Sequence, residues 1–280
     1  MIDFDSFLSE YKNKLAKMFK KEHETNGDAL ERGISQEKLS TILMSTPLAS
    51  FIPTEHGGFG GHTAEALSML EASSYESLPL SLMMGINGAL FLQPLANYGS
   101  EEAKNDVFGR VVQKGKMGGL MITEPDYGSE ALKMQTSVEY NASNNHYMVK
   151  GTKHWAGLTG MADYWIMTAR EKNSQGELGR DVSFFVHDSR NGGIEVKEYY
   201  NNLGLYMLPY GKNKVDINVP ASHKLTPKGT GITLMLDLLH RSRLQFPGMG
   251  MGFLRRMTDE AVQHCRERLV GGVSLLNYDQ

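Results

Sequence analysis

The spacing of hydrophobic residues changes twice along the chain, and this change restricts its possible folds more than any other feature. From residue 5 to about 116, apolar residues recur at helical spacing, and one predicted face contains Phe7, Leu8, Tyr11, Leu15, Met18 and Phe19. From 117 to about 225, short alternating runs such as TSVEY and VSFFVHD are separated by Asn, Gly, Ser and Pro clusters, which is typical of strands and turns. Helical spacing returns after residue 226.

This order predicts an α+β multidomain protein. We expect an N-terminal all-α domain over 1–116, a middle β-barrel-like domain over 117–225, and the start of a C-terminal helical bundle over 226–280. The 280 residues, 40% of them hydrophobic, are enough for a large core.

Composition excludes several classes of function. A net charge of -3 without a basic block gives no reason to expect a nucleic-acid partner. The N-terminus begins with acidic residues and has no continuous apolar segment, so we predict neither a secretory signal nor a membrane span there, and expect a cytoplasmic protein without a membrane partner. Cys265 is the single cysteine, so no disulfide can form within the chain; its predicted helical stripe with Phe253 and Met257 favours a buried thiol over a nucleophile.

The common catalytic motifs are absent from the sequence. It contains no H-E-x-x-H, C-x-x-C, G-x-S-x-G or P-loop pattern, so we predict no metal site and no hydrolase or phosphoryl-transfer chemistry of those kinds. The segment GMGMGF (248–253) could suggest a dinucleotide loop, but no strand precedes it. We instead predict a helix whose small residues let a second helix approach closely, with a kink or break at Pro247.

The segment MITEPDYGS (121–129) predicts a rigid turn at the end of a strand. Pro125 fixes its own φ, Gly128 can adopt a positive φ, and the amides around Gly128 and Ser129 can form a concave site for an anion such as phosphate. An ordinary β-turn capped by Ser129 fits the same spacing, and both interpretations stay open on this evidence alone.

Several segments together resemble the acyl-CoA dehydrogenases, which are FAD-dependent flavoproteins of α–β–α architecture. The segments are TEPDYGSE (123–130), KGTKHW (150–155), Ala162-Asp163, IPTEHGGFGG (52–61) and YGSEEAKNDVFGRVVQKGK (98–116). Each is short, but the combination is specific and the resemblance covers nearly the whole chain.

The resemblance implies roles for individual residues. It implies FAD binding by Leu120, Ile122, Thr123, Gly128, Ser129, Trp155 and Gly157, and substrate binding by Ser129 and Arg243. Thr123 would lie beside the flavin ring, the Gly128-Ser129 segment would meet phosphate and the thioester arm, and Glu124 would hold the turn. Trp155 would pack on the isoalloxazine, the alternative being an ordinary core tryptophan, and Arg243 would lie near the CoA channel, the alternative being a surface charge.

The resemblance also implies an oxidoreductase of fatty acid metabolism. Its reaction is the α,β-dehydrogenation of an acyl-CoA or acyl-carrier-protein thioester: a carboxylate takes the α-proton while a hydride passes to flavin N5. The partners implied are an electron-accepting flavoprotein and further copies of the chain, in a dimer or tetramer.

The sequence departs from the family pattern at two places. The family's W-I-T is Trp155-Ala156-Gly157, which removes the threonine that bonds flavin N5, and we expect Thr159 as the compensating residue. The segment SLLNYDQ (274–280) resembles the loop after the family's first long C-terminal helix, so most of the helical bundle is expected to be missing. No catalytic base is identified, because Ser242 occupies a position where some relatives carry a glutamate.

These departures leave alternatives open. We favour a fragment of a longer enzyme over a second polypeptide that completes the bundle or a loss of catalysis. The alternative functions are a flavin oxidase or monooxygenase, and a catalytically idle binding or assembly subunit. Because the stripe from Phe253 to Leu269 needs a partner, we expect residues after about 230 to pack on another chain or to be poorly ordered alone.

Overall fold

The computed structural model describes residues 3–25 and 35–278. The helices are α1 (Phe4–Thr25), α2 (Gln36–Leu43), α3 (Thr63–Glu76), α4 (Leu78–Asn87), the π-helical turn η4 (Gly88–Leu92), α5 (Gln93–Tyr98), α6 (Glu101–Lys114), α7 (Gly231–Leu244) and α8 (Phe246–Glu267). The strands are β1 (Gly118–Met121), β2 (Ser137–Asn141), β3 (His146–Gly157), β4 (Tyr164–Glu171), β5 (Ser183–Asp188), β6 (Ile194–Tyr199), β7 (Tyr210–Pro220), β8 (Leu269–Val270) and β9 (Val273–Ser274). Short 3-10 turns are η2 (Pro47–Phe51), η3 (Thr54–His56), η5 (Ala131–Lys133), η6 (Ser189–Asn191), η7 (Ala221–His223) and η8 (Leu275–Asn277).

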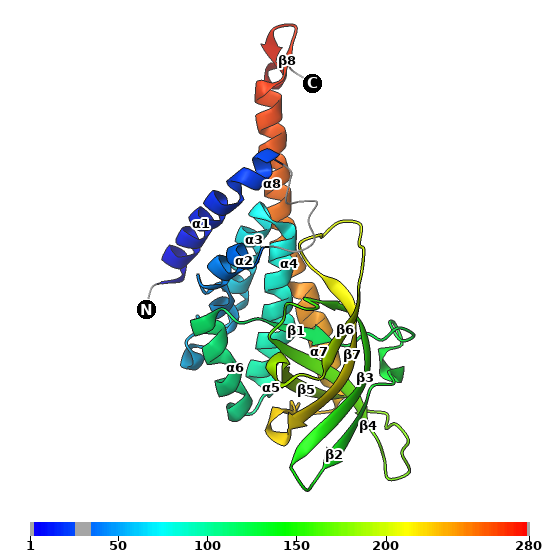
Figure 1. Cartoon of the computed structure of the whole chain (residues 1–280). Coiled ribbons are helices and arrows are strands. Elements are labelled where there is room, and N and C mark those ends of the chain that lie inside the picture. The colour runs from blue at the N-terminus through cyan, green and yellow to red at the C-terminus, as the bar shows by residue number, and fades with distance from the viewer. Residues whose placement is uncertain (1–2, 26–34, 279–280) are drawn as a thin grey trace.

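The observed order of helices, strands and helices confirms the predicted fold class. Helices α1–α6 form an N-terminal helical layer, β1–β7 curl into a half-barrel beside it, and α7–α8 run back along the helices (Figure 1). The sheet is curled but not closed, and β7, which alternates buried and exposed residues, is a strand that the sequence analysis did not single out. The division into domains at 116 and 225 stays a prediction.

The sheet is organised around β4. This strand pairs parallel with β1, antiparallel with β5 and, at its end, parallel with β2, and the path continues through β3 and β7 to β6. Strand β4 is buried from Tyr164 to Ala169, as expected for a strand covered on both faces. The segment that follows β1 lies next to the end of β3, where the His154 N–H donates to the Thr123 carbonyl oxygen.

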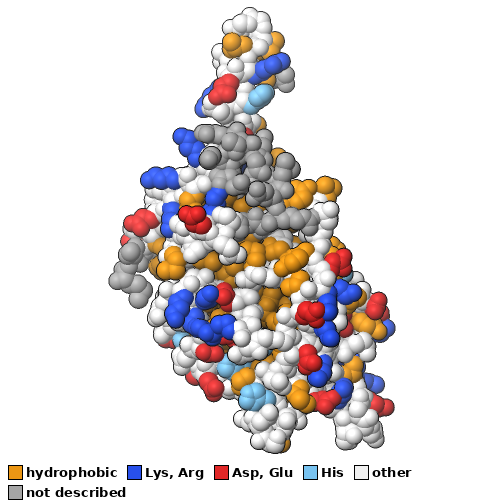
Figure 2. Space-filling model, viewed as in Figure 1, with side chains coloured by type: hydrophobic (Ala, Val, Ile, Leu, Met, Phe, Trp, Pro, Cys, Tyr) orange, Lys and Arg blue, Asp and Glu red, His pale blue; other side chains and the backbone are white. Residues whose placement is uncertain are grey.

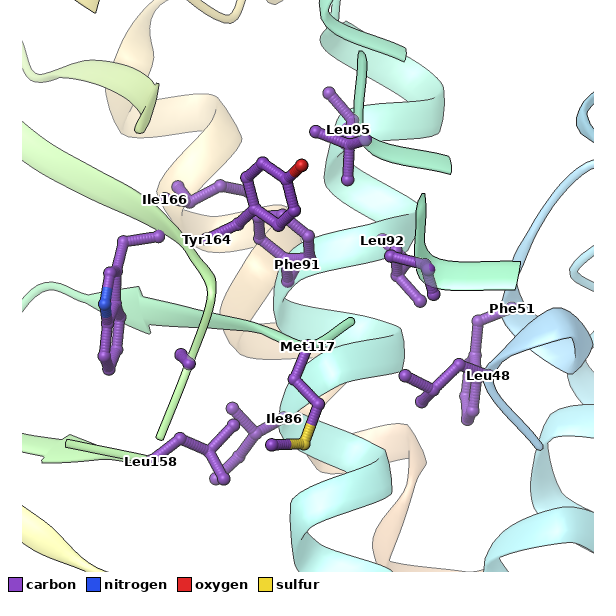
Figure 3. Close-up of a cluster of buried hydrophobic side chains, with 14 of the residues drawn as sticks. Leu48, Phe51, Ile86, Phe91, Leu92, Leu95, Met117, Leu158, Tyr164 and Ile166 are labelled. Atoms are coloured by element: carbon purple, nitrogen blue, oxygen red, sulfur yellow. The ribbon is translucent and has the colours of Figure 1, made fainter. Parts of the chain in front are cut away.

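A single hydrophobic core joins the helical layer to the sheet. Figure 3 shows Leu158 from the β3–β4 connection against Ile86 of α4, and Tyr164 of β4 against Phe91 of the π-helical turn. The rings of Phe91 and Tyr164 are stacked with their centroids 6.2 Å apart. The helices therefore fix the position of the strand ends that carry the predicted site.

The apolar helical segment Leu78–Tyr98 has the length and composition of a membrane span, but 72% of that window is buried within this protein. Both Met83 and Met84 are fully buried, which makes them core residues. The π-helical turn lies directly before Pro94, whose missing N–H and ring disfavour regular α-helical bonding at that point. The segment is consistent with a central helix of a folded core.

The close approach of α3 and α8 depends on two glycines of GMGMGF. A Cβ added to Gly248 would lie 2.7 Å from the carbonyl oxygen of Leu67, and one added to Gly252 would lie 2.2 Å from that of Glu71. The helix runs through the motif, and Pro247 lies in the first turn of α8 immediately after α7 ends. The predicted helix packing is therefore confirmed.

The second half of α8 extends beyond the body of the protein (Figure 1). Hydrophobic side chains are visible on its projecting end in Figure 2, and the stripe that includes Phe253 and Met257 is about half exposed. The prediction that Cys265 is buried is wrong for this structure: its side chain is half-buried, because its neighbours on the stripe have no packing surface within residues 3–25 and 35–278. Whether this face is covered by another chain stays a prediction.

The helix also ends earlier than the periodicity suggested. Leu269 lies in β8 and not in α8, since Gly271 and Gly272 both have positive φ and form the turn of the β8–β9 hairpin.

Two matched substitutions test the packing of α3 on α8. Gly252→Ala should lower the free energy of unfolding by about 1–3 kcal/mol, because its methyl group would collide with the backbone of α3. Gly250→Ala should instead raise it by up to about 1 kcal/mol, because nothing lies within 4 Å of the added Cβ and alanine favours the helix. Urea unfolding measures both; equal effects would contradict this packing.

Candidate cofactor site

Glu124 holds the turn of MITEPDYGS by its side chain. Its carboxylate is buried and accepts hydrogen bonds from the backbone N–H groups of Gln135, at 2.6 Å, and Thr136, at 3.0 Å. The hydroxyl of Thr136 donates to the same carboxylate. The backbone of Glu124 also bonds to that of Tyr127 across the turn, so Pro125 lies at the corner of a closed loop.

Lys153 is the charged partner of this carboxylate. Its side chain is fully buried, and its ammonium group lies 3.0 Å from Glu124 Oε1, 3.0 Å from Thr168 Oγ1 and 3.1 Å from the carbonyl oxygen of Ile122. The ammonium therefore joins three segments: the turn, the end of β3 and the middle of β4. The attraction within a buried ion pair offsets the cost of removing both charges from water only where both groups also have their remaining hydrogen bonds.

The pKa values of the pair reflect this environment. Burial acts to raise the pKa of Glu124, but Lys153, Thr136 and the Gln135 N–H outweigh it and hold that pKa below its usual value. Burial lowers the pKa of Lys153, and the attraction of Glu124 only partly offsets this effect. The carboxyl is thus ionised in the neutral range.

A β-bulge at the end of β3 displays Trp155. The pairing of β3 with β7 shifts register between Lys153 and Ala156, and Trp155 has a φ of 53°. Its side chain is 50% exposed, whereas Trp165 is buried. The alternative of a core tryptophan is therefore wrong, and the indole is held at the surface by strained backbone.

The bulge and the turn are fixed to each other. The backbone N–H of His154 donates to the carbonyl oxygen of Thr123 at 2.8 Å, and Lys153 bonds to both segments. The two stretches that the sequence analysis singled out, 121–129 and 150–157, are adjacent in space.

Aromatic rings surround the indole. The ring of Trp155 lies 4.6 Å from that of Tyr200 and 6.2 Å from that of Tyr210, measured between centroids. The hydroxyl of Tyr200 is hydrogen-bonded to His154 Nδ1, which ties the β6–β7 connection to the bulge. These contacts leave part of the indole open to a ligand.

Two hydroxyl groups of the predicted site remain available. Neither the Thr123 nor the Ser129 hydroxyl has a hydrogen-bond partner among the described residues, and Ser129 is exposed. Gly128 is also exposed, but its φ is not positive, so the predicted left-handed conformation is not adopted here. Leu120 and Ile122 are half-buried on either side of Met121, in the strand and turn that lead to Thr123.

The comparisons with known proteins agree with this arrangement. Sequence models of two domains match: "Acyl-CoA dehydrogenase, N-terminal domain" over residues 47–115, and "Acyl-CoA dehydrogenase, middle domain" over 119–216. The second match contains both the turn and the bulge. The chain belongs to the acyl-CoA dehydrogenase family.

Individual relatives extend this result. Glutaryl-CoA dehydrogenase of Desulfococcus multivorans is 29% identical over 223 residues, 78% of this chain and 56% of the relative. The structure of butyryl-CoA dehydrogenase from Megasphaera elsdenii is similar in fold, with a TM-score of 0.85 and 19% identity over 99% of this chain and 73% of that one. A glutaryl-CoA dehydrogenase from Mycobacterium smegmatis in complex with FADH2 matches with a TM-score of 0.77 and 20% identity, over 99% of this chain and 70% of that one. The chain spans about half the length of the curated relatives it matches.

The expected compensation for the family's missing threonine is not available. Gly157 is buried, and a Cβ there would lie 2.8 Å from Ile86 Cδ1. The Thr159 hydroxyl is fully buried and donates to the carbonyl oxygen of Ala156 at 2.7 Å while accepting from Asn213. Thr159 therefore has no free donor for a flavin, and that expectation was wrong.

The structure does not bring Arg243 to the other predicted residues. Arg243 lies exposed near the end of α7, whereas Arg241 lines a small cavity of about 100 Å³ between α3, the π-helical turn and α7. The guanidinium of Arg241 is paired with Asp237, with 2.7 Å between Nε and Oδ2. A substrate role for Arg243 stays a prediction in this acyl-CoA dehydrogenase chain.

Sequence reasoning missed two parts of the site. The pattern K-x-W at a strand end could have indicated that Lys153 belongs to the site. Its pairing with Glu124 could be predicted only from the order of strands in the sheet. The His154–Tyr200 contact joins residues 46 positions apart, and no local pattern indicates it.

A substitution of the buried carboxylate tests its role. Glu124→Gln should lower the free energy of unfolding by about 3–5 kcal/mol at pH 7, because the buried amine of Lys153 would lose its charged partner and would have to stay charged without solvent or give up its proton. The exposed pair Glu130–Lys133 supplies the control, and Glu130→Gln should change urea unfolding little.

The same pair predicts a pH dependence. Because folding lowers the pKa of Glu124, its contribution to stability is present above its usual pKa of 4.5 and is lost as pH falls through the folded value. The difference between the wild type and Glu124→Gln should therefore shrink in urea titrations below about pH 4.5. A constant difference down to pH 2.5 would contradict this assignment.

Proposed function

We propose that this chain binds FAD and takes part in the α,β-dehydrogenation of an acyl-CoA or acyl-carrier-protein thioester. The observation that carries the proposal is the half-exposed Trp155 on a strained bulge, held against the turn of Glu124 by the buried Lys153. Strain of this kind persists where the surrounding structure imposes it, and it is concentrated at active sites and ligand-binding segments.

The residues present fit a flavin. Trp155 offers an exposed aromatic face to a planar ring, and the Thr123 hydroxyl is available at the neighbouring turn. Gly128 and Ser129 are exposed beyond the turn, and a Cβ on Gly128 would meet nothing within 4 Å, so a phosphate can approach this backbone. In this proposal Leu120, Ile122, Thr123, Gly128, Ser129 and Trp155 hold the cofactor.

Bound FAD would supply the hydride acceptor for the reaction. The chain would orient the ring through Trp155 and the turn, and exclude water through the apolar contact of Gly157 with Ile86. It would not take the α-proton through α7: Ser242 is no base, and Asp237, the one carboxylate of α7, is engaged by Tyr98 and Arg241.

The proposal extends to the setting of the reaction. The electrons would pass to a separate flavoprotein, the chain would assemble as a homo-oligomer through its exposed α7–α8 face, and the enzyme would act in the cytoplasm. The exposed hydrophobic side chains of α7 and α8, which include Leu244, Phe246, Leu254 and Met257, support the assembly, because large exposed apolar patches mark interfaces.

FAD titration tests the proposal. Wild-type protein should bind FAD with quenching of flavin fluorescence, and Trp155→Ala should weaken that binding about tenfold, since it removes a stacked ring. Leu203→Ala is the control, because Leu203 is 99% exposed on a neighbouring connection and should leave the affinity unchanged.

The flavin's response to substrate separates the remaining outcomes. Bleaching of bound FAD by butyryl-CoA without oxygen supports dehydrogenation, whereas thioester binding without bleaching indicates a chain without its own base, which is either an idle binding subunit or one that needs a second polypeptide. Wild-type protein that binds no FAD contradicts the proposal altogether.

One observation favours a flavin oxidase or monooxygenase as the second candidate. Gly157 provides no hydroxyl at the family's threonine position, and Thr159 cannot replace it. Oxygen consumption with release of hydrogen peroxide during turnover would favour this candidate over a dehydrogenase.

A further inference from the structure

A cavity other than the small one beside Arg241 lies next to the aromatic rings of Tyr200 and Tyr210 that contact Trp155. It has a volume of about 390 Å³, within the range of small-molecule sites, and is lined by the β6–β7 connection, the segment that follows β3 and Gln36 of α2. Its lining includes Tyr199, Tyr200, Tyr206, Tyr210, Leu208 and Met161.

This cavity is separate from the proposed flavin site. None of the seven residues predicted to bind FAD lines it. Tyr200 and Tyr210 form its wall on the side of Trp155, because their rings contact the indole. The two sites share a wall and no binding residue.

The lining is aromatic and uncharged. Four tyrosine side chains face one cavity, and none of its lining residues, all of which the structure describes, carries a formal charge. The side-chain amides of Gln36 and Asn202 and the phenol groups are the main sources of hydrogen bonds. Burial raises the pKa of both Tyr200 and Tyr210, so these phenols stay neutral at physiological pH.

Strained backbone concentrates around the same cavity. Five non-glycine residues of the described chain have positive φ; two of them, Leu158 and Leu205, lie in the segments that line the cavity, and Trp155 lies in the adjoining bulge. Gly160 also has a positive φ, and a Cβ there would lie 2.1 Å from the Tyr199 hydroxyl. The backbone at Gly160 thus leaves room for the side chain of Tyr199. Backbone conformations that cost conformational energy are concentrated at binding sites.

We propose that this cavity is a binding site for a planar, uncharged aromatic ring. The tyrosine rings offer edge and face contacts to such a ring, and the apolar Leu208 and Met161 complete its surroundings. A charged ligand would lose its hydration without gaining an opposite charge. The site does not depend on the proposed dehydrogenation, because it uses none of that site's residues.

Two probes of similar size test the proposal. Isothermal titration calorimetry should show that 2-naphthol binds at least about threefold more tightly than decahydro-2-naphthol, because only the first is planar and aromatic. The chain has two tryptophans, so its amide NMR spectrum contains two indole N–H peaks, assigned with Trp155→Phe. Binding of 2-naphthol should move the Trp155 peak and leave that of the buried Trp165 unchanged.

Variants locate the binding site. Tyr206→Leu, which keeps an apolar side chain but removes a ring, should weaken 2-naphthol binding at least about threefold. Met161→Trp, which fills the cavity, should abolish it. Tyr140→Leu is the control for Tyr206→Leu. Because Tyr140 lies on the exposed side of β2, this substitution should not change 2-naphthol binding.

Three results would overturn the proposal: equal binding of the two probes, binding unaffected by both cavity variants, or displacement of 2-naphthol by FAD. The last result would place the probe in the proposed flavin site. Absence of FAD binding leaves this test intact, so the two proposals can fail separately.

Discussion

The buried ion pair between Lys153 and Glu124 is the interaction on which the rest of the site depends. An ammonium group without solvent needs hydrogen-bond acceptors, and here they come from the carboxylate, the Ile122 carbonyl and Thr168. Satisfying one charge therefore brings together the turn, the end of β3 and β4. The half-buried Thr123 and the half-exposed Trp155 are positioned as a consequence.

Small residues make the second contribution, by allowing elements to approach closely. Gly252 brings the backbone of α8 against α3, and Gly157 brings the end of β3 against Ile86 of α4. The helical layer thereby sets where the bulge lies. For the proposed flavin site, such contacts would fix the spacing of the walls more firmly than loops do.

The aromatic cluster links the two proposed binding sites. Tyr200 and Tyr210 contact the indole on one side and line the tyrosine-rich cavity on the other. A ligand in that cavity would touch the same rings that orient Trp155. The departure at Gly157 and the engaged hydroxyl of Thr159 show that this part of the molecule differs chemically from the family pattern, although the fold is the same.

The sequence by itself determined the order of helical and β segments, the rigid turn after β1, and the identity of the residues around it, because hydrophobic period and turn chemistry are local properties. It also indicated that Glu124 holds the turn. Only the tertiary structure decided that Lys153 is its buried partner, that Trp155 is exposed on a bulge, that Thr159 is engaged, and that Arg243 is exposed near the end of α7. These outcomes depend on which strands are neighbours and on how closely the helices pack against them. Contacts between residues distant in sequence leave no periodic signal in either segment alone.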